Sequence, residues 1–157
     1  HMKKLICMLW ISSILAANLN FAEPAEASSV SVVENYFRFL NSGNFEGLLS
    51  LFHDDVIWHQ PGQNHLSKAY HGKQEVAELF NNFMVISDGS FKIDEVSAIM
   101  GNGDLVTALI KFSAQRCNYI GVSMAMAGVD LMRVVYGKIV EVWLFSADQA
   151  QEDAFWG

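Results

Sequence analysis

The chain has 157 residues, of which 52% are hydrophobic and 17% are charged. This length and this share of apolar residues suit one compact domain with a sizeable core. The formal net charge is -7, and no cluster of Lys and Arg lies among aromatic residues beyond the N-terminus, so we expect no nucleic-acid partner.

The first residues have the form of a secretory signal peptide. After a cloning scar at the first two positions, a pair of lysines precedes the apolar run of residues 5–17, and Ala25-Glu26-Ala27 offers a small-x-small cleavage site. The apolar run is shorter than the ~20 residues that span a bilayer, so we expect no stable membrane anchor. We assign residues 1–27 to the scar and signal peptide and residues 28–157 to one exported domain, periplasmic or secreted.

Helical patterns dominate the first half of the chain. Ser31 and Glu34 form a capping-box pattern, which predicts a helix over residues 31–40 after a linker. Residues 45–52 read as a second, short helix with Leu and Phe facing inward. Apolar residues then recur at i, i+3, i+4 and i+7 and predict a third helix that begins at residue 72.

Strand patterns follow in the second half. A short strand is predicted over residues 56–60, before a polar loop at residues 63–71. Two longer strands are predicted over residues 91–100 and 105–116. Asp148 is placed to cap a short final helix.

A last hairpin carries an acidic residue on an apolar strand face. Tyr136-Gly137-Lys138 is a plausible tight turn between two strands rich in β-branched, Met and aromatic residues. Counting by twos from Asp130 gives one strand face, which holds Val122, Met124, Met126, Gly128, Met132 and Val134. Burial on such a face should raise the pKa of Asp130, and a neutral carboxyl group can donate a hydrogen bond to a ligand. The alternative is a structural Asp satisfied by Tyr36 or by a backbone amide.

The order of elements defines the fold class. Helices followed by a run of antiparallel strands form an α+β pattern, in which the long helix packs on the concave face of a curved sheet. Such a half-open cone encloses an apolar pocket, and function must be argued from that pocket.

Several motifs also resemble those of one superfamily. They are Val33-x-x-Tyr36, Leu40-Asn41-Ser42-Gly43-Asn44, Leu51-Phe52-x-Asp54-Asp55, Trp58-His59-Gln60-Pro61-Gly62, Asp130-x-x-Arg133 and Gly137-Lys138-Ile139-Val140-x-x-Trp143. Together they resemble the nuclear-transport-factor-2-like superfamily, and more narrowly its SnoaL-like polyketide cyclase and ketosteroid isomerase branches. The resemblance implies a cone-like curved antiparallel sheet wrapped around three N-terminal helices, an apolar small-molecule ligand and a homodimer formed through the outer face of the sheet.

The resemblance to ketosteroid isomerase assigns roles to three positions. It places the tyrosine and the protonated aspartic acid that hold the developing oxyanion on Tyr36 and Asp130, and it places the base on Gln60. An amide cannot take a proton at neutral pH, so the chain departs from that enzyme at the proton transfer. Its Trp-His-x-Pro-Gly segment is more similar to SnoaL-like members.

His59 is the candidate for a replacement base, because histidine titrates near neutral pH. Strand parity argues against it, since Trp58 and Gln60 share one face and His59 lies on the other. The candidate catalytic residues are therefore Asp130, Tyr36 and His59. Candidates for substrate binding are Gln60 and, with plain core packing as the alternative, Trp58, Phe83, Met124, Met126, Met132 and Trp143.

These residues favour two classes of function. The first is an isomerase, cyclase or lyase that performs acid–base chemistry on an apolar, carbonyl-bearing polyketide- or steroid-like molecule. The second is a non-catalytic exported protein that binds a hydrophobic ligand, or an interaction module. We expect no cofactor and no metal, because the acidic and histidine residues around His53 lack the spacing of a metal site.

Overall fold

The structure, a computed structural model, describes residues 25–116 and 121–157. Its elements in chain order are α1 (Ala25–Ser42), α2 (Phe45–Ser50), β1 (Phe52–Gln60), β2 (Lys68–His71), α3 (Gly72–Ser87), β3 (Lys92–Asn102), β4 (Leu105–Gln115), β5 (Ser123–Val135), β6 (Lys138–Ser146) and α4 (Gln149–Trp156). Within these ranges no helix is both long and apolar enough to cross a membrane. The predicted signal peptide lies outside the described residues, except for its last three, which begin α1.

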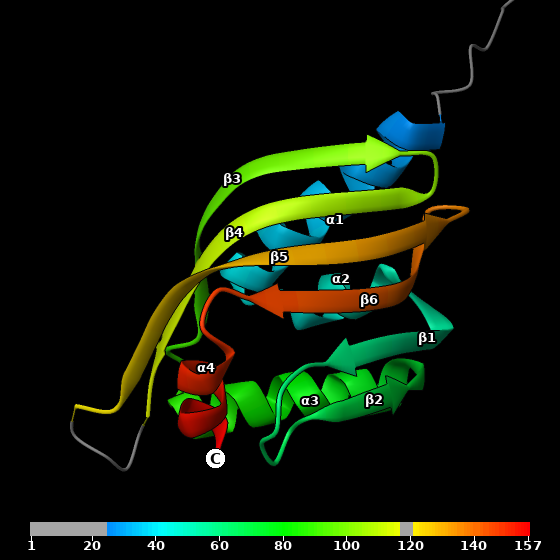
Figure 1. The fold of residues 1–157 in the computed structure, drawn as a ribbon. Helices are drawn as coiled ribbons and strands as arrows, with labels where there is room; N and C mark the ends of the chain where they lie inside the picture. The colour runs from blue at the N-terminus through cyan, green and yellow to red at the C-terminus, as the bar shows by residue number, and fades with distance from the viewer. Residues whose placement is uncertain (1–24, 117–120) are drawn as a thin grey trace, which may run out of the picture.

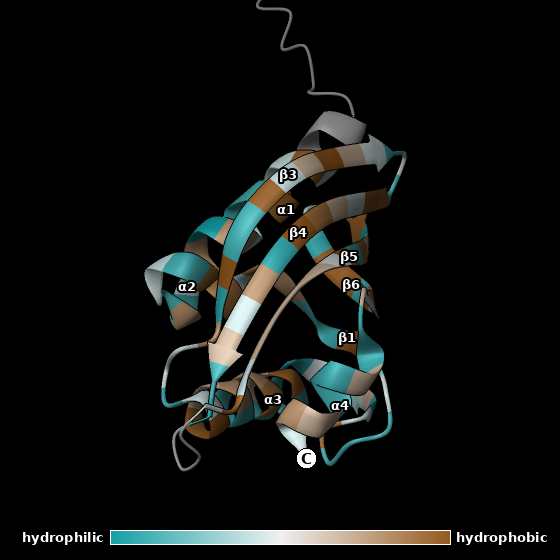
Figure 2. Cartoon of the chain, turned by 60° about the vertical axis from the view of Figure 1, so that its left-hand side comes forward, coloured by the Kyte–Doolittle hydropathy of each residue, from teal (hydrophilic) through white to brown (hydrophobic). Residues whose placement is uncertain are grey.

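The strands form one curved sheet in the order β2-β1-β6-β5-β4-β3, as Figure 1 shows. All neighbouring strands are antiparallel except β1 and β6, which run parallel. Helices α1 and α3 cover the concave face, and α4 lies at one end of the cone. Hydrophilic and hydrophobic residues alternate along β3 and β4 (Figure 2), as expected for strands with one buried face. The predicted α+β cone is confirmed.

Helix α1 begins earlier than the capping pattern predicts. It starts at Ala25, so Ser31 lies inside the helix and not at its first turn. Alanine is the strongest helix former, and the Ala-rich segment before Ser31 therefore extends the helix toward the N-terminus. Val33, Tyr36 and Leu40 are buried along the face that packs on the sheet. The predicted linker before residue 31 is thus wrong from Ala25 onward.

Two strand segments were not predicted from the sequence. Strand β1 begins at Phe52, four residues before the predicted start, because Phe52 pairs with Ile139 of β6. The predicted loop at residues 63–71 contains β2, whose register on β1 pairs Trp58 with Tyr70. Both segments are polar, and pairing with a neighbouring strand outweighs their weak local preference.

The predicted hairpin around Asp130 is confirmed as β5 and β6. Tyr136 and Gly137 occupy the turn with φ of 48° and 74°, the left-handed pair that matches the twist of a hairpin. Met132 and Val134 are buried on the same face as Asp130. The hairpin therefore carries Asp130 to the concave side of the sheet.

Candidate active site

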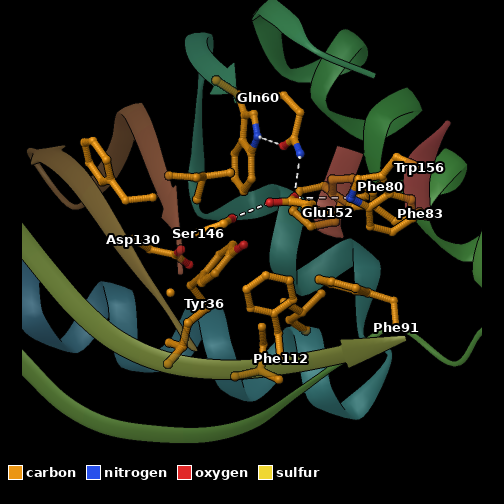
Figure 3. Close-up of a pocket in the computed structure, with 17 residues that line it drawn as sticks. Tyr36, Gln60, Phe80, Phe83, Phe91, Phe112, Asp130, Ser146, Glu152 and Trp156 are labelled. Carbon is orange, nitrogen blue, oxygen red and sulfur yellow. Dashed lines mark hydrogen bonds between the residues drawn. The ribbon is translucent and has the colours of Figure 1, made fainter. Parts of the chain in front are cut away.

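The concave face of the sheet and helices α1, α3 and α4 enclose a cavity of about 50 Å³, shown in Figure 3. This volume exceeds the ~10–15 Å³ that one water molecule needs, and it is well below the ~300–1,000 Å³ of sites for drug-sized ligands. The aromatic lining consists of Tyr36, Trp58, Phe80, Phe83, Phe91, Phe112 and Trp156. The polar lining consists of Gln60, Asp130, Ser146 and Glu152.

Asp130 reaches the cavity from the middle of β5, where Ala108 of β4 and Leu144 of β6 flank it. Its residue surface is only 7% exposed. No hydrogen bond from a described residue reaches its carboxyl group. Burial first, and then the charge of Glu152, raise the pKa of Asp130 from 3.8 to about 7. At neutral pH a large fraction of this carboxyl group is therefore protonated and can donate a hydrogen bond.

Tyr36 reaches the same space from α1. Its ring is buried among aromatic rings, with centroid distances of 6.1 Å to Phe52 and 6.5 Å to Trp58. Burial and then the charge of Asp130 raise the pKa of Tyr36 well above 10.0, so its hydroxyl stays protonated. Within the described part of the chain, this hydroxyl has no hydrogen-bond partner. Figure 3 shows the polar ends of Tyr36 and Asp130 facing one region of the cavity.

A second buried carboxyl group, Glu152 of α4, was not predicted as a site residue. One of its oxygens accepts from the Ser146 hydroxyl, and the other accepts from the Trp156 indole at 3.2 Å and the Gln60 amide at 3.5 Å. The Gln60 amide is itself oriented, because its oxygen accepts from the Trp58 indole at 3.0 Å. The pKa of Glu152 is raised overall, because burial has the largest effect and the hydrogen bonds from Ser146 and Trp156 offset only part of it. These donors stabilise the charged form of Glu152.

Asp130 and Glu152 therefore differ in their surroundings. Asp130 lacks donors and has a pKa near neutrality, whereas Glu152 accepts three hydrogen bonds from fixed groups. Two nearby carboxyl groups with such environments separate into one acid and one base.

Several predicted site residues lie elsewhere. His59 lies on the outer face of the sheet, where its Nε2 is 2.8 Å from Glu141 and its ring stacks on Trp143 at 5.5 Å. Neither His59 nor Trp143 lines the cavity. Successive side chains of a strand point to opposite faces, so His59 points away from the face that carries Trp58 and Gln60. Trp58, Gln60 and Phe83 do line it.

The three methionines predicted as pocket residues also lie outside the cavity lining. Met132 is fully buried in the core, Met126 packs against the core, and Met124 lines a separate hollow. They share the strand face of Asp130, as counted from the sequence. The strand is longer than the cavity, so a shared face does not mean a shared site.

Histidine, cysteine and acidic side chains are the usual metal ligands in proteins. Among the described residues, no group of three or more His, Cys, Asp or Glu side chains is placed to hold a metal ion. The polar groups that reach the cavity are two carboxyls, two hydroxyls and one amide, from Asp130, Glu152, Tyr36, Ser146 and Gln60. These groups can donate, accept and move protons.

The cone-shaped α+β fold is that of the nuclear-transport-factor-2-like proteins, among them one from Burkholderia xenovorans LB400 that is 18% identical, with a TM-score of 0.71 over 85% of this chain and 99% of that chain. The chain matches the family model of the SnoaL-like domain over residues 33–142, and it belongs to this family. The predicted resemblance to SnoaL-like proteins is thus confirmed. No curated protein matches the chain.

Solved structures share the fold. A protein of unknown function with a cystatin-like fold from Xanthomonas campestris is 42% identical, with a TM-score of 0.78 over 82% of this chain and 98% of that chain. TerC, co-crystallised with polyporic acid, is 15% identical, with a TM-score of 0.70 over 82% of this chain and 98% of that chain. An epoxide hydrolase of the LEH-like type from M. tuberculosis is 15% identical, with a TM-score of 0.63 over 85% and 94% of the two chains.

Proposed function

We propose that the protein is an acid–base enzyme, an isomerase, cyclase or lyase, that acts beside a carbonyl group of an apolar small molecule. One observation carries this proposal. Asp130 and Tyr36 face the cavity without hydrogen-bond partners among the described residues, and the hydrogen-bonded carboxylate of Glu152 lines the same cavity. This arrangement offers two donors for an oxygen and one acceptor for a proton.

In this reaction, the protonated Asp130 and the Tyr36 hydroxyl donate hydrogen bonds to the substrate carbonyl oxygen. Glu152 takes a proton from the neighbouring carbon, and negative charge develops on the oxygen that Asp130 and Tyr36 hold. A carboxylate has about four acceptor sites, and three are used by Ser146, Trp156 and Gln60, so one remains for the proton. Return of the proton to a different carbon completes an isomerisation.

The fold neighbours give modest support. TerC was co-crystallised with polyporic acid, and the M. tuberculosis neighbour is described as an epoxide hydrolase. At 15% identity they say nothing about which residues of this chain react.

Two measurements test the two halves of the site. Binding of phenol, a mimic of the enolic oxygen, should weaken by ~tenfold or more in Asp130→Asn and in Tyr36→Phe, because each removes one donor. Exchange of the α-protons of a small cyclic enone in D2O, followed by NMR, should stop in Glu152→Gln. Glu141→Gln is the matched control, since Glu141 lies on the outer face against His59. Phenol binding unchanged in both donor variants would refute the oxyanion site.

A non-catalytic ligand-binding protein is the second candidate function, and Gln60 favours it. An amide stands where the resemblance to ketosteroid isomerase places the base, as it would in a protein that had lost its catalysis. In that case phenol still binds through Asp130 and Tyr36, but the enone exchanges no faster than in buffer. The exchange rate of the wild type therefore separates the two functions.

We also propose that the protein is exported and that it forms a homodimer. Cleavage after Ala27 would leave Ser28 as the first residue, which mass spectrometry of the secreted or periplasmic protein would detect. Leu109 and Phe145, 41% and 59% exposed, are apolar side chains that a dimer through the outer face would cover. A monomeric mass by light scattering would refute the dimer.

A further inference from the structure

A second, larger hollow lies next to the inner cavity. It measures about 740 Å³ and is formed by the ends of α1 and α3 and by β3, β4 and β5. This hollow is called the groove below; its lining includes Asn41, Met84, Lys92, Gln115, Ser123 and Met124. Leu40 and Phe91 line both the groove and the inner cavity. The two spaces therefore share these two side chains, which are called the partition below.

Phe91 forms the main part of this partition. Its ring lies 5.3 Å from Phe83, 6.1 Å from Trp156 and 6.3 Å from Phe112, centroid to centroid. Figure 3 shows Phe91 on the side of the cavity away from Asp130. Phe91 is only partly buried, so its ring can move toward the groove without leaving a closed core.

The volumes of the two spaces suggest how a ligand could fit. The inner cavity of about 50 Å³ accepts a reacting group but no complete apolar substrate. The groove of about 740 Å³ lies within the range of sites for drug-sized ligands. We propose that both form one bipartite site, in which the carbonyl end of the ligand reaches Asp130 and Tyr36 and its body lies in the groove beyond Phe91. This inference rests on the proposed function.

The groove lining indicates the chemistry of that body. Among the described lining residues, Lys92 is the one with a charged side chain, and it is paired with Asp94 at 3.5 Å. A lining without a free charge fits an uncharged ligand body. The substrate class is therefore an extended neutral molecule with a carbonyl at one end.

Two phenols of different length test the bipartite site. Phenol carries the reacting group alone, whereas equilenin carries the same group on a rigid four-ring body that must extend into the groove. Met84→Trp places an indole at the groove lining and should weaken equilenin binding by ~tenfold or more, with less than ~twofold change for phenol. Asn82→Trp, at an exposed position of α3 that lines neither space, should change neither affinity.

The outcomes separate the two proposals. Equilenin affinity that is lost in Asp130→Asn but unchanged in Met84→Trp would overturn the bipartite site and leave the oxyanion site standing. Affinity for both phenols that is unchanged in Asp130→Asn would overturn the proposed function itself. As a second readout, Phe91→Leu should raise the association rate of equilenin and not that of phenol. The smaller leucine side chain would obstruct less of the passage between the groove and the inner cavity. Equal effects on both association rates would contradict the role of Phe91.

Discussion

Replacement of Asp130 by Asn should stabilise the fold at alkaline pH and have little effect at acidic pH. The pKa of Asp130 is about 7 in the folded protein, against 3.8 for an ordinary Asp. Between these values the unfolded chain releases this proton while the folded chain retains it, so rising pH favours unfolding. Below pH 3.8 both states are protonated and the effect vanishes. Above pH 7 the full shift of about three units, at ~1.36 kcal/mol each, destabilises the wild type by about 4 kcal/mol.

Urea unfolding of both proteins at several values between pH 4 and pH 8.5 measures this effect. The free energy of unfolding of Asp130→Asn minus that of the wild type should rise by about 4 kcal/mol across this range, because the amide cannot ionise. Asp55→Asn, an exposed Asp on β1, is the control and should show no such rise. A difference that is constant with pH, or that falls as pH rises, would refute the assignment of a buried, protonated Asp130.

Three further predictions follow from the same geometry. In Glu152→Gln the pKa of Asp130 should fall, because the Glu152 charge contributes to raising it; carboxyl 13C NMR titration would show this, and an unchanged pKa would contradict the coupling. Gly128→Ala should lower stability by about 1–2 kcal/mol in thermal unfolding, since its Cβ would lie 3.1 Å from the Phe145 carbonyl oxygen. Tyr136→Asn should raise stability by about 0.5–1 kcal/mol, because Tyr136 is fully exposed at φ 48° and Asn tolerates that conformation. A destabilised Tyr136→Asn variant would show that the ring contributes packing.

The parts of the fold that the sequence predicted well are those with strong apolar periodicity. Helix α3 and the β5–β6 hairpin bury one face each, and their spacing is visible without a structure. Strand β2 and the first half of β1 carry few apolar residues, and they are strands because they pair with neighbours. Such pairing depends on residues far along the chain, which a local pattern does not contain.

The lining of the cavity was predicted in part, and the difference has a geometric cause. A 13-residue strand such as β5 is ~40 Å long at ~3.3 Å per residue. One face of it can therefore pass through a core, a cavity and a groove. Met132, Asp130 and Met124 occupy these three environments in turn, although their spacing makes them look equivalent.

Glu152 could not be recognised locally, because its partners are distant in the sequence. It lies 92 residues from Gln60, and a glutamate near the end of a chain is usually solvated. The available signal was weak: Glu152 is four residues before Trp156, so a buried helix face that contains the Trp also contains the Glu. The burial of both residues confirms that face.

The positions of Gln60 and Glu152 together explain how a site can keep a base when the expected strand position is an amide. The Gln60 oxygen accepts from Trp58, so its NH2 group must point toward Glu152. Gln60 thus donates to the carboxyl group that supplies the base in the proposed function. That group comes from α4, a helix that only tertiary packing brings to the cavity. The charge of the same group contributes to raising the pKa of Asp130, so its place on α4 also favours the protonated form of the opposing acid.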